Sequence, residues 1–120
     1  MADEGWSEEE LRNQETRLHQ LVEELESALT ATRESSKTVE LDQPIGRLSR
    51  MDAIQQQKMA AAARRNTELR LAQVRGALHA IEQGTYGECR LCEEEIGKRR
   101  LQARPESPFC LQCQKRSESR

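Results

Sequence analysis

The chain of 120 residues carries its four cysteines in two short motifs, Cys89-Arg90-Leu91-Cys92 and Cys110-Leu111-Gln112-Cys113, with seventeen residues between them. Two residues between paired cysteines let both thiolates point at one metal ion, and two such pairs complete the tetrahedral sulfur shell that suits zinc. The spacing therefore predicts one zinc ion with four protein ligands, which are Cys89, Cys92, Cys110 and Cys113.

The predicted zinc ion has a structural role, because four thiolates leave no coordination position for water or substrate. We therefore expect a protein that is not an enzyme.

Disulfides are the alternative, but the first ten residues, MADEGWSEEE, lack the features of a signal peptide, so we expect a cytoplasmic protein with reduced thiols. Zinc binding contributes roughly 10 kcal/mol or more. This is enough to fold a small module over residues 85–116.

The sequence before the cysteines predicts a long helix over residues 7–36, preceded by a tail of residues 1–6. Ser7 and Glu10 have the spacing of a capping box. Apolar residues then recur in the heptad pattern that is typical of paired helices, with Gln14 as the one misfit. The heptad positions are Leu11, Leu18, Leu21, Leu25 and Ala28, and Val22 and Leu29 widen the stripe.

A turn is predicted near residues 37–47, where Pro44 and Gly46 interrupt helical sequence. A second helix then runs to Gln83, and Gly84 stands where a helix terminator belongs. Its apolar stripe is clearest near its end and weakens toward the turn, so we expect the distal half of the hairpin to be looser. The clearest stripe consists of Leu71, Val74, Leu78 and Ile81.

The expected fold class is mainly α. A long antiparallel helical hairpin, or coiled coil, occupies residues 7–84, and a small C-terminal zinc finger with four cysteine ligands follows it. A short terminal helix begins at residue 114 and a tail covers residues 117–120.

Hydrophobic residues make up 35% of the chain and aromatic residues 2%. This composition excludes a broad globular core, and no apolar run is long enough to span a membrane.

Charge is divided unevenly along the chain. Residues 1–45 contain 12 acidic and 4 basic residues, whereas residues 46–120 contain 9 acidic and 15 basic residues. The two helices of the hairpin therefore attract each other. The net charge of −2 argues against binding nucleic acid by charge alone and favours a protein partner.

The cysteine-rich segment resembles the C4 zinc finger of the DksA/TraR family. The resemblance rests on Tyr86-Gly87-Glu88-Cys89-Arg90-Leu91-Cys92, on Glu95-Ile96-Gly97-Lys98-Arg99-Arg100-Leu101-Gln102-Ala103-Arg104-Pro105 and on the second cysteine motif. It implies a bacterial transcription regulator that binds RNA polymerase and does not contact DNA directly. Members of this family insert the helical hairpin through the secondary channel of the polymerase. Acidic residues at the hairpin tip then approach the catalytic centre, often together with the alarmone ppGpp.

The resemblance carries over unevenly to individual residues. Arg100 and Arg104 stand where the family's finger has arginines, the second of which helps to hold the alarmone. The residue after the last cysteine is commonly basic in the family but is Gln114 here, and a helix lysine of the family aligns with Gln73. These departures argue against binding of ppGpp.

The family's tip motif, two aspartates spaced three apart and followed by alanine, is absent. Asp42 and Asp52 are the candidate tip acids, and Arg47 and Arg50 are candidate contacts to an acidic polymerase surface. In the ordinary interpretation, Asp42 caps the turn and Asp52 pairs with a neighbouring arginine.

Two other functions compete with a monomeric polymerase regulator. The hairpin could serve as a dimerisation element, with a second chain packing where Arg64 and Arg65 interrupt the apolar stripe. The finger could instead be a zinc ribbon that reads nucleic acid, although Glu93, Glu94 and Glu95 would repel phosphate. Its candidate contacts are Lys98, Arg99, Arg100, Arg104, Lys115 and Arg116.

Overall fold

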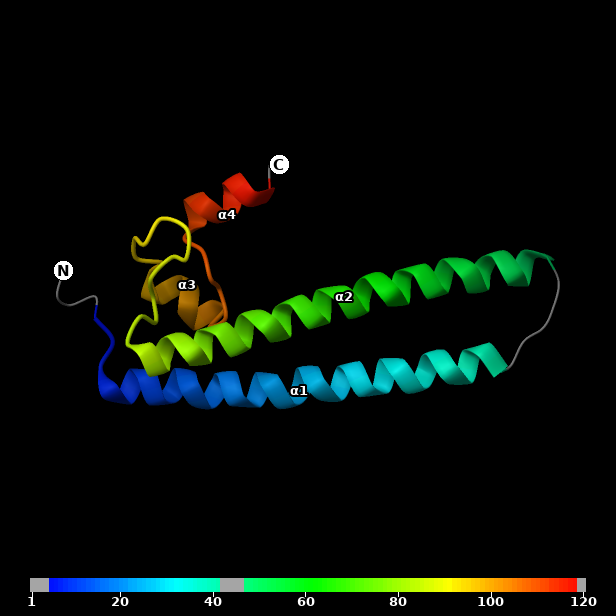
Figure 1. Cartoon of the computed structure of the whole chain (residues 1–120), viewed down its shortest axis with the longest axis horizontal. Helices are drawn as coiled ribbons and strands as arrows, with labels where there is room; N and C mark the ends of the chain where they lie inside the picture. The colour runs from blue at the N-terminus through cyan, green and yellow to red at the C-terminus, as the bar shows by residue number, and fades with distance from the viewer. Residues whose placement is uncertain (1–4, 42–46, 119–120) are drawn as a thin grey trace.

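The computed structural model describes residues 5–41 and 47–118, with the side chains of residues 33–41 and 47–49 outside the description. In these ranges the chain forms four helices, α1 (Glu8–Leu41), α2 (Arg47–Gln83), α3 (Lys98–Ala103) and α4 (Leu111–Glu118). The α1 and α2 helices form a long antiparallel hairpin, and the C-terminal segment folds back beside α2 at its base (Figure 1). The molecule measures 64 × 31 × 19 Å. The predicted mainly α architecture is confirmed.

The α1 helix begins as the capping box predicts. The Glu10 backbone N–H donates to Ser7 Oγ at 3.1 Å, and the Ser7 N–H donates to Glu10 Oε1 at 2.9 Å. The helix continues to Leu41, beyond the predicted end at residue 36. Serine, lysine, threonine and valine each cost less than about 0.7 kcal/mol in a helix, so Ser35 and Ser36 do not terminate it. The helix therefore extends five residues into the range 37–47 in which the turn was predicted.

The core of the hairpin lies in its basal half. Leu18 and Val74 have 0% exposure, and Leu25, Leu71 and Ala77 are also buried. Burial of one such leucine stabilises the fold by about 1.5–3 kcal/mol. Two details of the predicted stripe differ in the structure. Leu29 is half-buried and packs against this core while Ala28 is exposed, and Ala77 is more deeply buried than Leu78.

The distal half of the hairpin buries less apolar surface. Its side facing α1 carries small half-buried residues, Ala53, Ala60 and Thr67. Met51 and Met59 are each 65% exposed. The helices also separate toward the tip (Figure 1). No helix in the described parts of the chain combines the length and the apolar character needed to cross a membrane.

Gly84 ends α2, as predicted. Its φ angle of 77° lies in the left-handed region that favours glycine. The Thr85 N–H then donates to the Ala80 carbonyl at 2.9 Å, and the Gly84 N–H donates to the Ile81 carbonyl at 3.2 Å. This C-cap satisfies carbonyls at the helix end and turns the chain into the cysteine-rich segment.

Candidate metal centre

The four cysteine sulfurs converge on one point. The Sγ atoms of Cys89, Cys92, Cys110 and Cys113 all lie within 4.8 Å of one another. Sulfurs bound at about 2.3 Å around a tetrahedral zinc ion lie about 3.8 Å apart. The Cys92 and Cys110 sulfurs are 3.7 Å apart, and none of the four cysteines forms a disulfide. The geometry therefore fits one four-coordinate zinc ion.

Tight turns position the first cysteine pair. Gly87 and Gly97 have φ angles of 100° and 105°, and Glu93 adopts a φ angle of 65°, which is uncommon outside glycine. Two backbone bonds close the loop between these turns, from the Cys89 N–H to the Glu94 carbonyl and from the Ile96 N–H to the Gly87 carbonyl, both 2.8 Å long. The two thiols thus project from one rigid knuckle.

A helix positions the second pair. The predicted terminal helix begins three residues earlier than expected, at Leu111, so that Cys113 lies within α4 and Cys110 directly precedes it. The Gln114 N–H donates to the Cys110 carbonyl at 2.9 Å. Cys113 is buried while Cys110 is partly exposed. The metal site therefore joins a turn to a helix start.

The thiols differ in how readily they ionise. Burial raises the pKa of Cys89, but backbone N–H groups of Cys92, Cys110 and Leu91 favour its thiolate more strongly and lower the pKa to about 6. Burial and then the neighbouring Cys110 thiol raise the pKa of Cys113 to about 12. Full ionisation of four adjacent thiols therefore needs a bound cation, as zinc supplies in such sites.

A short helix that the sequence analysis missed fills the finger. The α3 helix lies inside the predicted zinc module, in a stretch for which no helix was predicted, and its Leu101 is 1% exposed. Arg100 donates through Nε to the Phe109 carbonyl at 3.2 Å. Six residues rich in lysine and arginine gave no apolar periodicity, so only the spacing of Ile96 and Leu101 hinted at a packed element.

Gln14, the misfit of the heptad pattern, attaches the finger to α1. It is 4% exposed, and its Nε2 donates to Tyr86 Oη at 2.9 Å and to the Leu101 carbonyl at 3.0 Å. The Tyr86 hydroxyl in turn donates to the Pro105 carbonyl at 2.9 Å. A polar residue in the apolar stripe thus marks the place where a third segment packs on the hairpin.

Glu106 and Arg90 attach the finger to α2. Glu106 is 1% exposed, and its Oε2 accepts hydrogen bonds from Arg70 Nε at 2.8 Å and from Arg104 Nε at 3.2 Å. The Arg90 guanidinium lies directly over Gly76, where a β-carbon would lie 2.9 Å from Arg90 Nη1. The finger therefore rests on the outer side of α2, with the Arg90 side chain lying over Gly76.

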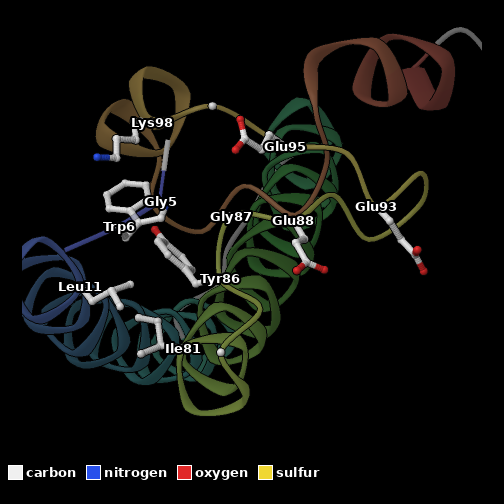
Figure 2. A pocket seen from close by; sticks show the side chains of 12 residues that line it. Gly5, Trp6, Leu11, Ile81, Tyr86, Gly87, Glu88, Glu93, Glu95 and Lys98 are labelled. Carbon is white, nitrogen blue, oxygen red and sulfur yellow. The ribbon is translucent and has the colours of Figure 1, made fainter. Parts of the chain in front are cut away.

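The segment before α1 completes the base. The Trp6 and Tyr86 rings are 5.3 Å apart, and Lys98 Nζ lies 5.4 Å from the Trp6 ring and donates to Glu10 Oε1 at 2.9 Å. These side chains border a cleft of about 550 Å³ between the N-terminal segment, the end of α2 and the finger (Figure 2). Trp6 is thereby held against the zinc module.

The predicted tip residues that fall within the described ranges lie far from this centre. Arg47 begins α2, and the side chains of Arg50 and Asp52 are exposed near that end of the helix. Asp42 lies outside the described residues. Figure 1 shows the start of α2 at the end of the hairpin opposite the finger. The structure therefore separates the tip candidates from Arg100 and Arg104 by the length of the hairpin.

Sequence comparisons match both parts of this architecture. The family model described as the prokaryotic dksA/traR C4-type zinc finger matches residues 84–119. The RNA polymerase-binding transcription factor DksA of Haemophilus influenzae is 30% identical over 125 residues, covering 94% of this chain and 81% of that protein. An uncharacterised protein of Aquifex aeolicus is 46% identical over 43 residues, covering 36% of this chain and 30% of that protein.

Solved structures share the same fold. The transcription factor DksA2 of Pseudomonas aeruginosa aligns with a TM-score of 0.76 at 22% identity, covering 94% of this chain and 86% of that chain. The RNA polymerase binding protein and transcriptional regulator Dks of Chlamydia trachomatis aligns with a TM-score of 0.58 at 24% identity, covering 94% and 92%. With four cysteines in zinc-binding geometry and a relative that matches nearly the whole chain, this protein belongs to the DksA/TraR family of C4 zinc-finger proteins.

Proposed function

We propose that this chain is a zinc-binding bacterial transcription regulator that binds RNA polymerase through its secondary channel. The observation that carries the proposal is the match of 94% of the chain to an RNA polymerase-binding transcription factor, finger and hairpin together. A narrow hairpin on a metal-fixed base is suited to reach into a channel. The protein then acts by binding rather than by catalysis, in the bacterial cytoplasm.

The rigid base supports a role as the outer anchor. Gln14, Glu106 and the zinc ligands fix the finger on both helices, so the finger keeps a defined orientation relative to the hairpin. Arg104 contributes to this surface, since 63% of its side chain is exposed while its Nε is held by Glu106. Arg100 supports the surface from within the finger.

The tip would deliver charge near the catalytic centre of the polymerase. Asp42 and Asp52 are the proposed acids, and Arg47 and Arg50 are the proposed contacts to acidic polymerase surface. An enzyme centre that works on phosphates is sensitive to small changes in nearby charge. The effect of the chain on initiation then depends on these few side chains.

Direct DNA binding and ppGpp binding are not part of this proposal. Lys98, a candidate phosphate contact, already pairs with Glu10, and Arg104 already pairs with Glu106. Glu93, Glu94 and Glu95 are exposed in the same finger. We propose that the regulator acts as a monomer and without the alarmone.

Titration of purified core RNA polymerase with the zinc-loaded full chain tests the proposal. Binding at low micromolar concentration, competed by another protein that occupies the secondary channel, is expected. The double variant Asp42→Asn with Asp52→Asn should keep this affinity but lose the effect on promoter complexes. The matched control is Glu68→Gln with Glu82→Gln, which removes two exposed acids of α2 away from its first turns.

Two results would contradict the proposal. Absence of polymerase binding at these concentrations would remove the function itself. Equal effects of the tip variant and the Glu68→Gln/Glu82→Gln control would show that total charge, not charge at the tip, alters initiation.

A further inference from the structure

The cleft at the base of the molecule has no role in the function proposed above. It has a volume of about 550 Å³ and lies between the segment before α1, the end of α2 and the finger (Figure 2). Pockets of this size hold small molecules in other proteins. Gly84 and Gly97 line the cleft, and a β-carbon at either position would meet no atom within 4 Å beyond its chain neighbours. The cleft therefore has room for a ligand.

One wall of the cleft is aromatic and apolar. The Trp6 and Tyr86 rings lie 5.3 Å apart at an angle of 58°. The half-buried side chains of Leu11 and Ile81 line the cleft next to these rings (Figure 2). The Tyr86 hydroxyl already donates to a backbone carbonyl and accepts from Gln14, so Tyr86 offers its ring to a ligand and not its hydroxyl. This wall suits the apolar part of a ligand.

The finger side of the cleft is acidic. Glu88 and Glu95 are exposed, and they lie opposite each other in an antiparallel bridge. The side chains of residues paired in this way lie on the same side of the two chain segments, and like charges there repel each other. Among the described residues neither carboxylate forms an ion pair. Both carboxylates lie on the finger side of the aromatic rings, whereas Glu93 points away from the rings (Figure 2).

One ammonium group of the chain already occupies the border of this cleft. Lys98 Nζ lies 5.4 Å from the Trp6 ring centroid, which is cation–π distance, and it donates to Glu10 Oε1 at 2.9 Å. The charge of Lys98 is therefore balanced by Glu10 and does not offset Glu88 and Glu95. The aromatic wall is thus shown to accept a cation, while the carboxylates on the finger side have none.

These features select one class of ligand. An anion would be repelled by Glu88 and Glu95. A neutral apolar molecule would remove water from the two carboxylates without replacing its hydrogen bonds. A metal ion would leave the aromatic wall unused, and two carboxylates are few for calcium, which takes six to eight oxygen ligands. An ammonium group carried on a short alkyl chain matches both sides of the cleft.

We propose that the cleft binds a small organic cation of the aliphatic diamine or polyamine class. The ammonium groups would pair with Glu88 and Glu95, and the alkyl chain would pack on Trp6, Tyr86 and Ile81. Charge-assisted hydrogen bonds supply the selectivity for amines, and burial of the alkyl chain adds affinity. The inference goes beyond the proposed function and does not depend on polymerase binding.

The intrinsic fluorescence of Trp6 tests the proposal, because Trp6 is the one tryptophan of the chain and lines the cleft. The zinc-loaded full chain is titrated with diaminohexane at constant ionic strength. Trp6 emission should change and saturate with a half-point at or below about 1 mM. Hexanediol has the same alkyl chain without the charges and should cause no saturable change.

Two charge-matched double variants locate the site. Glu88→Gln with Glu95→Gln removes both carboxylates at nearly constant size and should weaken diaminohexane binding at least about tenfold. Glu23→Gln with Glu24→Gln removes two exposed acids of α1 and should leave the affinity within about twofold. Circular dichroism and zinc content should be unchanged in both variants, since all four positions are exposed.

Thermal unfolding gives a readout that does not use fluorescence. A ligand that binds only the folded chain raises Tm. Diaminohexane should raise the Tm of the parent chain and of the Glu23→Gln/Glu24→Gln variant, but not that of the Glu88→Gln/Glu95→Gln variant. By calorimetry, Trp6→Leu should weaken binding at least about threefold, because it removes the ring that faces the ammonium group.

Four results would overturn the proposal. These are a fluorescence change that does not saturate, equal binding of hexanediol, equal loss of binding in the two charge-matched variants, and saturation by a lysine-rich peptide but not by diaminohexane. The last result would assign the cleft to a side chain of a protein partner. None of these results bears on the polymerase titrations, so the proposed function is tested separately.

Discussion

The two ends of this molecule are built in different ways from similar helical sequence. At the base, three segments are joined by zinc-binding cysteines, by hydrogen bonds such as that from Gln14 to the Leu101 carbonyl, and by the buried Glu106. Toward the tip, small residues face α1 while Met51 and Met59 face solvent. Stability is therefore concentrated at the base, and the proposed contacts to the polymerase lie toward the end of the hairpin that is packed less tightly.

A long helix therefore need not be packed equally tightly along its whole length. Isolated helical hairpins depend on packing of an apolar side more than on helix propensity. Here that packing is strong over roughly the half of α2 that the finger also contacts. Changes at the base should therefore cost stability, whereas equivalent changes toward the tip should cost binding.

Removal of zinc should have the largest effect, because it should abolish the structural difference between the base and the tip. A chelator, or replacement of Cys113 by serine, should unfold residues 85–116, because the metal contributes on the order of 10 kcal/mol to such a module. The finger would release Tyr86 and Lys98 from Trp6, which is the one tryptophan of the chain. Tryptophan fluorescence and circular dichroism should both change. Unchanged spectra after verified loss of the metal would contradict the account of the base.

A matched pair of leucine substitutions should show the next largest effect. Leu18→Ala removes a side chain with 0% exposure and should lower the free energy of unfolding by about 2–5 kcal/mol. Leu69→Ala acts on a side chain that is 61% exposed and should change it by less than about 0.5 kcal/mol. Urea unfolding of both variants checks the difference. Similar costs at the two positions would show that the halves of the hairpin are equally packed.

Glu106→Gln should destabilise the base by about 1–3 kcal/mol, because it removes the charge that Arg70 and Arg104 bind. Burial raises the pKa of Glu106, but its own backbone N–H and the two arginines outweigh burial and hold the pKa below the ordinary value of 4.5. A carboxyl with a lowered folded-state pKa contributes stability above its ordinary pKa. That contribution is lost as the pH falls through the folded-state pKa.

Unfolding curves recorded against pH should therefore show a difference between the parent chain and Glu106→Gln that is full at neutral pH and shrinks in acid. Because both chains have the same cysteines, metal release in acid affects them alike. A difference that stays constant with pH would contradict the ionised state assigned to Glu106.

Gln14→Leu should have a smaller effect on the free energy of unfolding, and it should destabilise the protein although the heptad pattern favours leucine here. The heptad rule favours leucine at this position, but the substitution leaves the Leu101 carbonyl without its donor and releases Tyr86 from Gln14. We expect a loss of about 1 kcal/mol, measured by thermal or urea unfolding. A gain in stability would show that the hydrogen bonds to the finger contribute less than a continuous apolar stripe.

The smallest effect should come from the exposed ion pair between Arg75 and Glu26 on the two helices. Both side chains are more than half exposed, at 57% and 51%. Arg75→Ala should therefore change the free energy of unfolding by no more than about 0.5 kcal/mol. A double-mutant cycle with Glu26→Ala checks the pair, and a coupling energy well above this would show that surface charge, not packing, joins the helices.

Sequence reasoning was sufficient where a local pattern has one physical solution. The spacing of the four cysteines, the capping box at Ser7 and the terminator Gly84 each predicted the structure found. The apolar stripe in the basal half, with Leu18 and Val74 at its centre, was also predictable from periodicity.

Prediction failed where distant segments decide the outcome. Gln14 looked like a flaw in the stripe because its partners, Tyr86 and Leu101, lie more than seventy residues away in the sequence. Glu106 and Arg70 gave no local signal for the same reason. The α1 helix continues beyond its predicted end at Ser36, since serine disfavours a helix far less than proline does.

The contact between Trp6 and the finger has a consequence for the order of assembly. Glu10 leaves the ribosome 88 residues before its partner Lys98. Contacts between residues so distant along the chain form late and slowly. The finger therefore docks on the start of α1 only after both helices of the hairpin have been synthesised and the second cysteine pair has emerged to bind metal.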